Sequence, residues 1–132
     1  MALICRFEIP YPEGKKAVAA WNKRFSLNAY YAGKNYHQRK RDADEMHSRT
    51  ILAVRQRRIR RQYVTGPVAV KFYWPARLDI DNHAVMGKMV VDALKGYILP
   101  DDNPRWYRRV THEYWPEMAI GVEIWDYEEE EK

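Results

Sequence analysis

Hydrophobic and polar residues alternate in several stretches of the chain, as they do in strands that bury one face. The stretch 67–74 shows this pattern clearly, because Val70 and Phe72 point to the opposite side from Lys71 and Tyr73. The other alternating stretches are 3–9, 105–115 and 118–124. The first and last of these are expected to bury Leu3, Cys5, Phe7, Ile9, Met118, Ile120, Val122 and Ile124. The pattern therefore predicts four strands.

Two longer stretches have the composition of helices. Residues 36–62 contain neither Gly nor Pro and few apolar residues, which predicts a long and largely solvent-facing helix. Residues 82–95 also favour a helix, which Gly96 can end. The apolar surface of that helix is expected to come from Ala84, Val90, Val91 and Leu94. A shorter helix over 15–22 is expected within the mixed segment 14–35.

The order of these elements is strand, helix, strand, helix, strand, strand. This βαβαββ order predicts an α+β protein with one mixed β-sheet and helices packed on it. A length of 132 residues fits a single domain, 1–132, that buries about two-thirds of its unfolded surface. The acidic run 126–132 is expected to form a disordered, solvated tail.

Composition and charge narrow the functional class. The single cysteine, Cys5, has no partner for a disulfide, which favours a reducing compartment. The sequence shows no signal peptide and no apolar run near 18 residues, so we expect a cytoplasmic protein without a membrane partner. The net charge of +5 and the pI near 9.3 suit a polyanionic partner such as a nucleic acid.

Carboxylates are concentrated between residues 79 and 102. Five of them fall in this stretch, Asp79, Asp81, Asp92, Asp101 and Asp102. Such crowding is electrostatically costly unless a cation lies among them. On an α-helix that includes Asp81, the side chains of Lys88 and Asp92 would follow after about two and three turns, along the same face.

The same residues resemble a known family motif. Asp79-Ile80-Asp81-Asn82, Lys88, Asp92-Ala93-Leu94 and Asp101-Asp102 are similar to the motif of the RusA family of Holliday-junction resolvases. Members of that family are metal-dependent endonucleases that cut four-way DNA junctions. The resemblance implies catalytic roles for Asp79, Asp81 and Asp102, and for Lys88, which follows Asp81 by seven residues here instead of the family's usual four.

The chemistry implied by the resemblance is metal-assisted hydrolysis of a phosphodiester. Convergent carboxylates can hold Mg²⁺, for which Mn²⁺ is a possible substitute, and the ion bridges to the phosphate while keeping several waters. Asp79, Asp81 and Asp102 would be the metal ligands, and Lys88 a point charge near the phosphate or the attacking water. The candidates for supporting positions around these ligands are Asn82, Asp92 and Asp101.

The end of the long expected helix is basic. It carries Arg55, Arg57, Arg58, Arg60 and Arg61 without any acidic residue. Cations at a helix C-terminus and a solvated face account for part of this run. Five arginines exceed that need, so we expect contacts with DNA phosphates.

Each feature also has a structural explanation. Asp81 or Asn82 can cap a helix, Lys88 and Asp92 can form an i to i+4 pair, and Asp101 and Asp102 can be turn residues. A basic DNA-binding module without catalysis therefore remains the alternative to a nuclease, as does a metal nuclease for other branched DNA. His83 and His112 lack zinc-site spacing and are interpreted as polar surface residues.

The symmetry of the substrate predicts an assembly. A Holliday junction has two-fold symmetry and must be cut at two related phosphates, yet the chain has one acidic cluster. A two-fold homodimer would place two sites on symmetry-related strands. The sequence does not indicate which surface forms the dimer.

Overall fold

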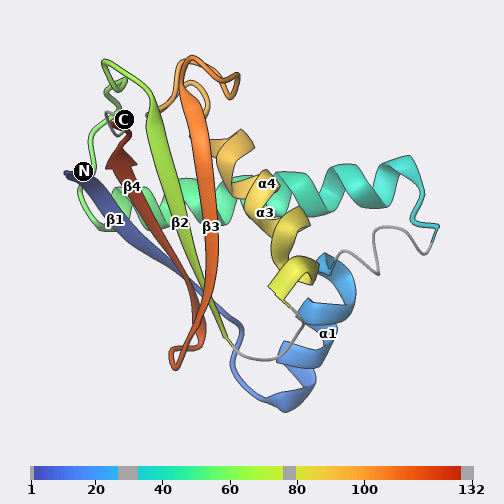
Figure 1. Cartoon of the computed structure of the whole chain (residues 1–132). Coiled ribbons are helices and arrows are strands. Elements are labelled where there is room, and N and C mark those ends of the chain that lie inside the picture. Colours follow the sequence, from blue (N-terminus) through green and yellow to red (C-terminus); the bar gives the residue numbers. More distant parts are fainter. Residues whose placement is uncertain (1, 27–32, 76–79, 129–132) are drawn as a thin grey trace.

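A computed structural model describes residues 2–26, 33–75 and 80–128 (Figure 1). The elements along the chain are β1 (Leu3–Pro10), α1 (Lys15–Phe25), α3 (Tyr36–Gln56), β2 (Val68–Pro75), the 3-10 helix η1 (Ile80–His83), α4 (Ala84–Leu94), β3 (Tyr107–Trp115) and β4 (Ala119–Asp126). No helix in this described part is both long and apolar enough to cross a membrane.

The four strands form one mixed sheet in the order β1-β4-β2-β3. β4 is antiparallel to both β1 and β2, whereas β2 and β3 are parallel and are connected through η1 and α4. β1, β2 and β3 therefore run in one direction, and their C-terminal ends lie at the same end of the sheet (Figure 1). The predicted α+β class and mixed sheet are confirmed, while the number and order of the helices differ in detail from βαβαββ.

The core lies between one face of the sheet and the helices α3 and α4. The alternation in 67–74 predicted correctly which face of β2 is buried, since Val70, Phe72 and Trp74 have almost no exposed surface. They pack in one cluster with Met46 of α3 and Met86 of α4. Burying aromatic and aliphatic side chains of this size is the main term that holds helices onto a sheet.

Gly87 sets how closely α4 approaches the sheet. A Cβ atom at this position would lie 3.3 Å from Cε2 of Phe72 and 3.4 Å from Cε1 of His112. These separations leave little room for a larger residue. The absence of a side chain at Gly87 therefore lets the first turn of α4 lie directly on the aromatic rings of β2 and β3.

Helix α3 ends six residues earlier than the sequence predicted. The N–H of Ile59 donates to the carbonyl of Val54 at 3.1 Å, and the N–H of Arg58 donates to the carbonyl of Arg55 at 2.9 Å. These are the two hydrogen bonds of a Schellman motif, whose C′ residue adopts a left-handed conformation. Arg58 occupies that position with φ 58°. Arg57, Arg58, Arg60 and Arg61 thus lie beyond the helix, and the prediction of an arginine-rich helix end was wrong.

Several other boundaries also differ from the sequence prediction. Helix α1 extends to Phe25 rather than to residue 22. Asp126 ends β4 and the N–H of Tyr127 donates to the carbonyl of Pro67 at 3.0 Å, so the expected tail does not begin at 126. The tail residues 129–132 lie outside the described residues. Three apolar residues expected in the core are exposed instead, namely Leu3, Ala84 and Met118.

Candidate functional site

The first half of the acidic motif lies before α4. Asp79 is outside the described residues, and Asp81 lies in η1 but its side chain is not described. Asn82 is half-buried in the same 3-10 helix. A 3-10 helix has 3.0 residues per turn, so the α-helical spacing expected between Asp81 and Lys88 does not apply across η1. The predicted helix 82–95 was correct in type but begins at Ala84.

His83 fixes η1 onto the sheet. Its ring is fully buried and stacks on the Trp74 indole, with centroids 4.5 Å apart and planes 9° apart. Neither ring nitrogen has a hydrogen-bond partner within the described part of the chain. Burial, with a smaller contribution from the charge of His112, lowers the pKa of His83 to about 4. His83 is therefore a neutral core residue, and its assignment to the surface was wrong.

His112 belongs to the same aromatic cluster. Its Nδ1 accepts a hydrogen bond from Nε1 of Trp74 at 2.9 Å, and its ring stacks on Phe72 at 5.4 Å. Partial burial lowers the pKa of His112. The alternation of β3 contained a signal for this position, because it places His112 on one face of the strand. In the parallel register His112 pairs with Phe72, so that face is the one toward the core. His112 is half-buried, so its interpretation as a surface residue was only partly correct.

The second half of the motif forms a row of alternating charges at the end of α4. Nζ of Lys88 lies 3.2 Å from Asp92, and Nζ of Lys95 lies 3.6 Å from Asp92. The same Lys95 nitrogen lies 3.5 Å from Oδ2 of Asp102. Sequence reasoning missed Lys95, although its position three residues after Asp92 was a signal for the first contact.

The charge row changes the pKa values of its members. Partial burial raises the pKa of Asp102, but the nearby charge of Lys95 and hydrogen bonds outweigh burial, and the net shift is downward. Partial burial lowers the pKa of Lys95, but the charges of Asp92 and Asp102 outweigh it and raise the value. Both groups are therefore ionised at neutral pH.

Asp101 shapes the loop that carries Asp102. One of its oxygens accepts the backbone N–H of Asp102 at 2.8 Å, and the other accepts the side-chain amide of Asn103 at 3.2 Å. Side-chain to backbone bonds of this type stabilise turns. A turn role for Asp101 is thus visible in the structure, as is the pairing of Lys88 with Asp92.

The two halves of the motif lie at opposite ends of α4. This helix has eleven residues and spans about 16 Å, with η1 at its start and Lys95 directly after its end. Asp102 contacts Lys95, so a single chain does not bring Asp102 next to η1. Within the described residues, no three His, Cys, Asp or Glu side chains are grouped closely enough to hold a metal ion.

The arginine-rich segment lies beside the Asp102 end of α4. Nε of Arg61 donates to the carbonyl of Gly96 at 2.8 Å, and the Tyr97 hydroxyl donates to the carbonyl of Ile59 at 2.9 Å. The exposed members are Arg55, Arg57, Arg58, Arg60 and Arg61. Arg58 and Arg60 also line a groove of about 510 Å³. Two segments that are far apart in sequence therefore form one surface.

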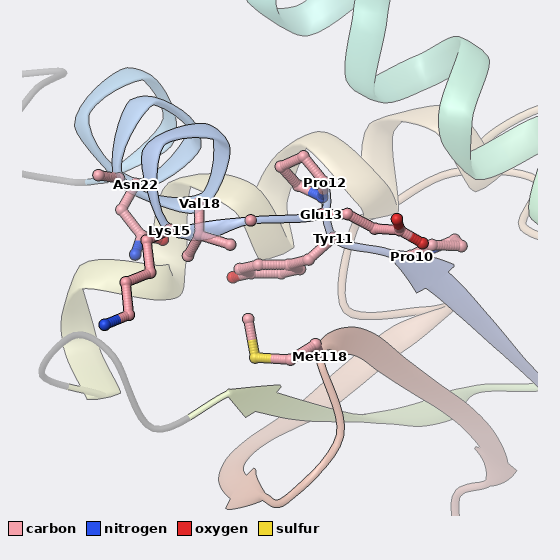
Figure 2. Close-up of a pocket in the computed structure, with 10 residues that line it drawn as sticks. Pro10, Tyr11, Pro12, Glu13, Lys15, Val18, Asn22 and Met118 are labelled. Carbon is pink, nitrogen blue, oxygen red and sulfur yellow. The ribbon is translucent and has the colours of Figure 1, made fainter.

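A second concave surface lies at the other end of the sheet, where β1 ends and α1 begins. Figure 2 shows the Tyr11 ring and Met118 facing each other across this pocket, with Lys15 and Asn22 at one side. The pocket has a volume of about 760 Å³. Burial raises the pKa of Tyr11 to about 12, so its phenol is neutral. No sequence motif predicted this pocket.

Comparison of the chain with models of known protein families found no matching family, and comparison with curated proteins found no matching relative.

Proposed function

We propose that this protein is a Mg²⁺-dependent, structure-selective endodeoxyribonuclease that resolves four-way DNA junctions by paired symmetric nicks. The RusA-like motif at 79–102 motivates the proposal. The observation that supports it best is the common surface formed by the arginine segment and the Asp102 end of α4, where Arg61 contacts Gly96. The arginines, which would bind phosphates, and Asp102 of the motif are thus found at the same end of α4, as cleavage of a DNA backbone requires.

Asp79, Asp81 and Asp102 are the proposed metal ligands. Because Asp102 lies at the opposite end of α4 from η1, a complete site would need residues from two copies of the chain. Carboxylate oxygens are the donors that Mg²⁺ prefers, and the lowered pKa of Asp102 keeps that residue charged. When bound, the ion would neutralise phosphate charge and orient a water for hydrolysis. Mn²⁺, which accepts the same oxygen donors, is the expected substitute.

Two lysines have distinct proposed roles. The Lys88 side chain is 73% exposed and contacts Asp92, so its ammonium can reach a phosphate outside the chain. Lys95 instead holds Asp102 in position and keeps it ionised. Asn82, Asp92 and Asp101 support this arrangement, Asp101 through the loop that carries Asp102.

The arginine segment is the proposed DNA-binding surface. Arg55, Arg57, Arg58, Arg60 and Arg61 would contact phosphates, which gives binding that weakens steeply with salt. Replacing Arg57, Arg58, Arg60 and Arg61 with Ala should reduce the slope of log K against log salt by about one unit for each lost contact. If the slope of log K against log salt equalled that of the wild type, the arginine segment would be solvated and would not contact phosphates.

The proposed assembly is a homodimer, because two related phosphates of a junction must be cut. The proposed location is the cytoplasm of a bacterial or phage-infected cell, where recombination and repair produce branched DNA. Other branched structures are possible additional substrates of the same site.

A non-catalytic DNA-binding module is the second candidate. It is favoured by the charge pairs, since Lys95 neutralises Asp92 and Asp102 and Asp101 stabilises a turn. In that case the acidic residues would serve structure and solubility alone, and the protein would hold junctions without cutting them.

The test compares the wild type with Asp81→Asn on end-labelled four-way junctions, with and without Mg²⁺. The proposed function requires symmetric nicks by the wild type that depend on Mg²⁺ and are lost in the variant, while both proteins bind the junction. Binding without nicks at any Mg²⁺ concentration would support the binding module. Full cleavage by Asp81→Asn would remove Asp81 from the site.

A further inference from the structure

Strand β3 lies at the edge of the sheet, with β2 on one side and no strand on the other in the part of the chain that the structure describes. None of its nine residues is fully buried, and Val110 and Tyr114 are 45% and 46% exposed. The other edge strand, β1, buries Phe7 and Ile9 completely. A long edge strand with exposed apolar side chains, and without Pro or Lys, is a template for pairing with another strand.

We propose that two copies of this chain pair along β3, antiparallel, in the register that places Thr111 of one copy opposite Thr111 of the second. Thr111 is the middle residue of Tyr107–Trp115, so this register pairs the whole strand. Residues paired across two strands point to the same face. A two-fold axis perpendicular to the sheet keeps every side chain on its own face. It must therefore lie midway between the two copies of one residue, so that this residue faces its own copy.

Charge complementarity selects Thr111 for the axis. With the axis at this residue, Arg109 of each copy lies opposite Glu113 of the second copy, which gives two opposite-charge pairs. Moving the axis to Val110 would place Arg109 opposite Thr111. Moving it to His112 would place Arg109 opposite Trp115. Either neighbouring register loses both charge pairs.

Arg109 and Glu113 are placed to make these contacts. Both lie on the sheet face away from the helices, where Glu113 is 3.3 Å from Lys71 and the Arg109 guanidinium lies 5.2 Å from the Tyr127 ring centroid. On the opposite face, Val110 would lie opposite His112 of the second copy. The pairing thus covers exposed apolar surface on one face and joins opposite charges on the other.

Antiparallel pairing also places the start of one β3 beside the end of the second. Asp102 lies near the start, since the N–H of Tyr107 donates to the carbonyl of neighbouring Asn103 at 2.9 Å. The 3-10 helix η1 lies near the end, where the His83 and Tyr114 rings are 6.5 Å apart. In the dimer, Asp102 of one copy and η1 of the second would therefore lie at the same end of the paired strands. The two-fold axis would repeat this arrangement at the other end. This consequence rests on the proposed function, whereas the pairing itself does not.

The experiment measures mass without DNA, by sedimentation equilibrium. The wild type should sediment at twice 15.8 kDa. Glu113→Arg places Arg opposite Arg109 and should weaken the dimer by about tenfold or more, because like charges directly opposite each other repel. The double variant Arg109→Glu with Glu113→Arg restores opposite charges and should recover the wild-type dimer. A mass of 15.8 kDa at every concentration would overturn the inference.

Cross-linking tests the register independently. In a Cys5→Ser background, Thr111→Cys should form a covalent dimer under mild oxidation, because the two residues face each other at the axis. The control is Thr65→Cys, an exposed threonine before β2. A dimer that is unaffected by Glu113→Arg, or that cross-links equally through both cysteines, would overturn β3 as the interface while leaving the nuclease activity to its own test.

Discussion

The two ends of α4 carry the two halves of one sequence motif in opposite physical environments. At its start, His83 is fully buried between aromatic rings and Gly87 lies against Phe72. At its end, Lys95 and Asp102 form a partly exposed ion pair. Buried aromatic packing contributes several kcal/mol to folding, whereas exposed ion pairs contribute about 0 to 1 kcal/mol. The start of α4 therefore contributes most to stability, whereas the charged side chains at its end contribute little and remain accessible.

The difference explains how one helix can hold charged side chains in fixed positions at the surface. A rigid contact at one end fixes the direction of α4, so that the charged side chains at the other end are held in place without being buried. Positions supported by a rigid scaffold allow surface residues to serve function at small cost in stability. Substitutions at the two ends should consequently separate into those that unfold the protein and those that leave it folded.

The largest effect is expected for Trp74→Ala. Trp74 is fully buried, stacks on His83 and donates its indole N–H to His112. Removing a buried aromatic side chain of this size should lower the free energy of unfolding by about 3–5 kcal/mol. Urea denaturation followed by circular dichroism measures the change. The matched change on the exposed face of the same helix, Lys88→Ala, should cost less than about 1 kcal/mol, and equal losses would contradict the comparison.

The next largest effect is expected for the pH dependence of the free energy of unfolding, which comes from His83. The folded-state pKa of His83 is about 4, below its ordinary value of 6.5, so the unfolded chain binds more protons between these values. The free energy of unfolding should thus be highest above pH 6.5 and fall as the pH drops toward 4, by about 3 kcal/mol at most. His112, whose pKa is also lowered, acts in the same direction.

His83→Phe keeps an aromatic ring against Trp74 but cannot be protonated. The variant should therefore lose most of the pH dependence between 6.5 and 4 while remaining folded at neutral pH. Urea denaturation of both proteins at a series of pH values measures this. If His83→Phe showed the same slope as the wild type, His83 would not be the group responsible.

The sequence predicted the helices and strands better than it predicted which of their side chains are buried. Alternation over 67–74 identified the buried face of β2, because a period of two reports burial directly. The burial of His83 depends on where η1 docks on the sheet, which no local pattern encodes. The left-handed conformation of Arg58 was equally hidden, because glycine is the usual residue at such a position.

The separation of Asp81 from Asp102 was not determined by the sequence. The eleven residues of α4 place the two segments about 16 Å apart, but the residues from Lys95 to Asp102 form a connection long enough to return along the helix. The pairing of Lys95 with Asp102 depends on the loop after Gly96, and sequence reasoning had no means to place that loop. The acidic motif thus indicated the candidate residues but not their arrangement.

A smaller effect, in the stabilising direction, is expected for Arg58→Gly beside the exposed end of α4. Glycine adopts φ 58° without the steric cost of a side chain, so the free energy of unfolding should rise by about 1 kcal/mol. Under the proposed function, the same variant loses one phosphate contact and should reduce the salt dependence of junction binding by about one unit. Arg60→Ala is the control, with the same loss of charge and no gain in stability. A destabilised Arg58→Gly would show that the Arg58 side chain contributes more than its backbone strain costs.

The smallest effect on stability is expected for Asp102→Asn, which nevertheless should abolish cleavage. Asp102 contacts Lys95 in a partly exposed pair, so losing its charge should change the free energy of unfolding by less than about 1 kcal/mol. Under the proposed function, a neutral amide cannot serve as the anionic metal ligand, while the arginine segment still binds the junction. The matched control is the neighbour Asp101→Asn, which keeps an oxygen able to accept the N–H of Asp102 and should retain activity. Measuring unfolding, junction binding and Mg²⁺-dependent nicking on both variants separates the possibilities: an active Asp102→Asn would remove this residue from the metal site, and an unfolded one would place the end of α4 among the structural elements of the fold.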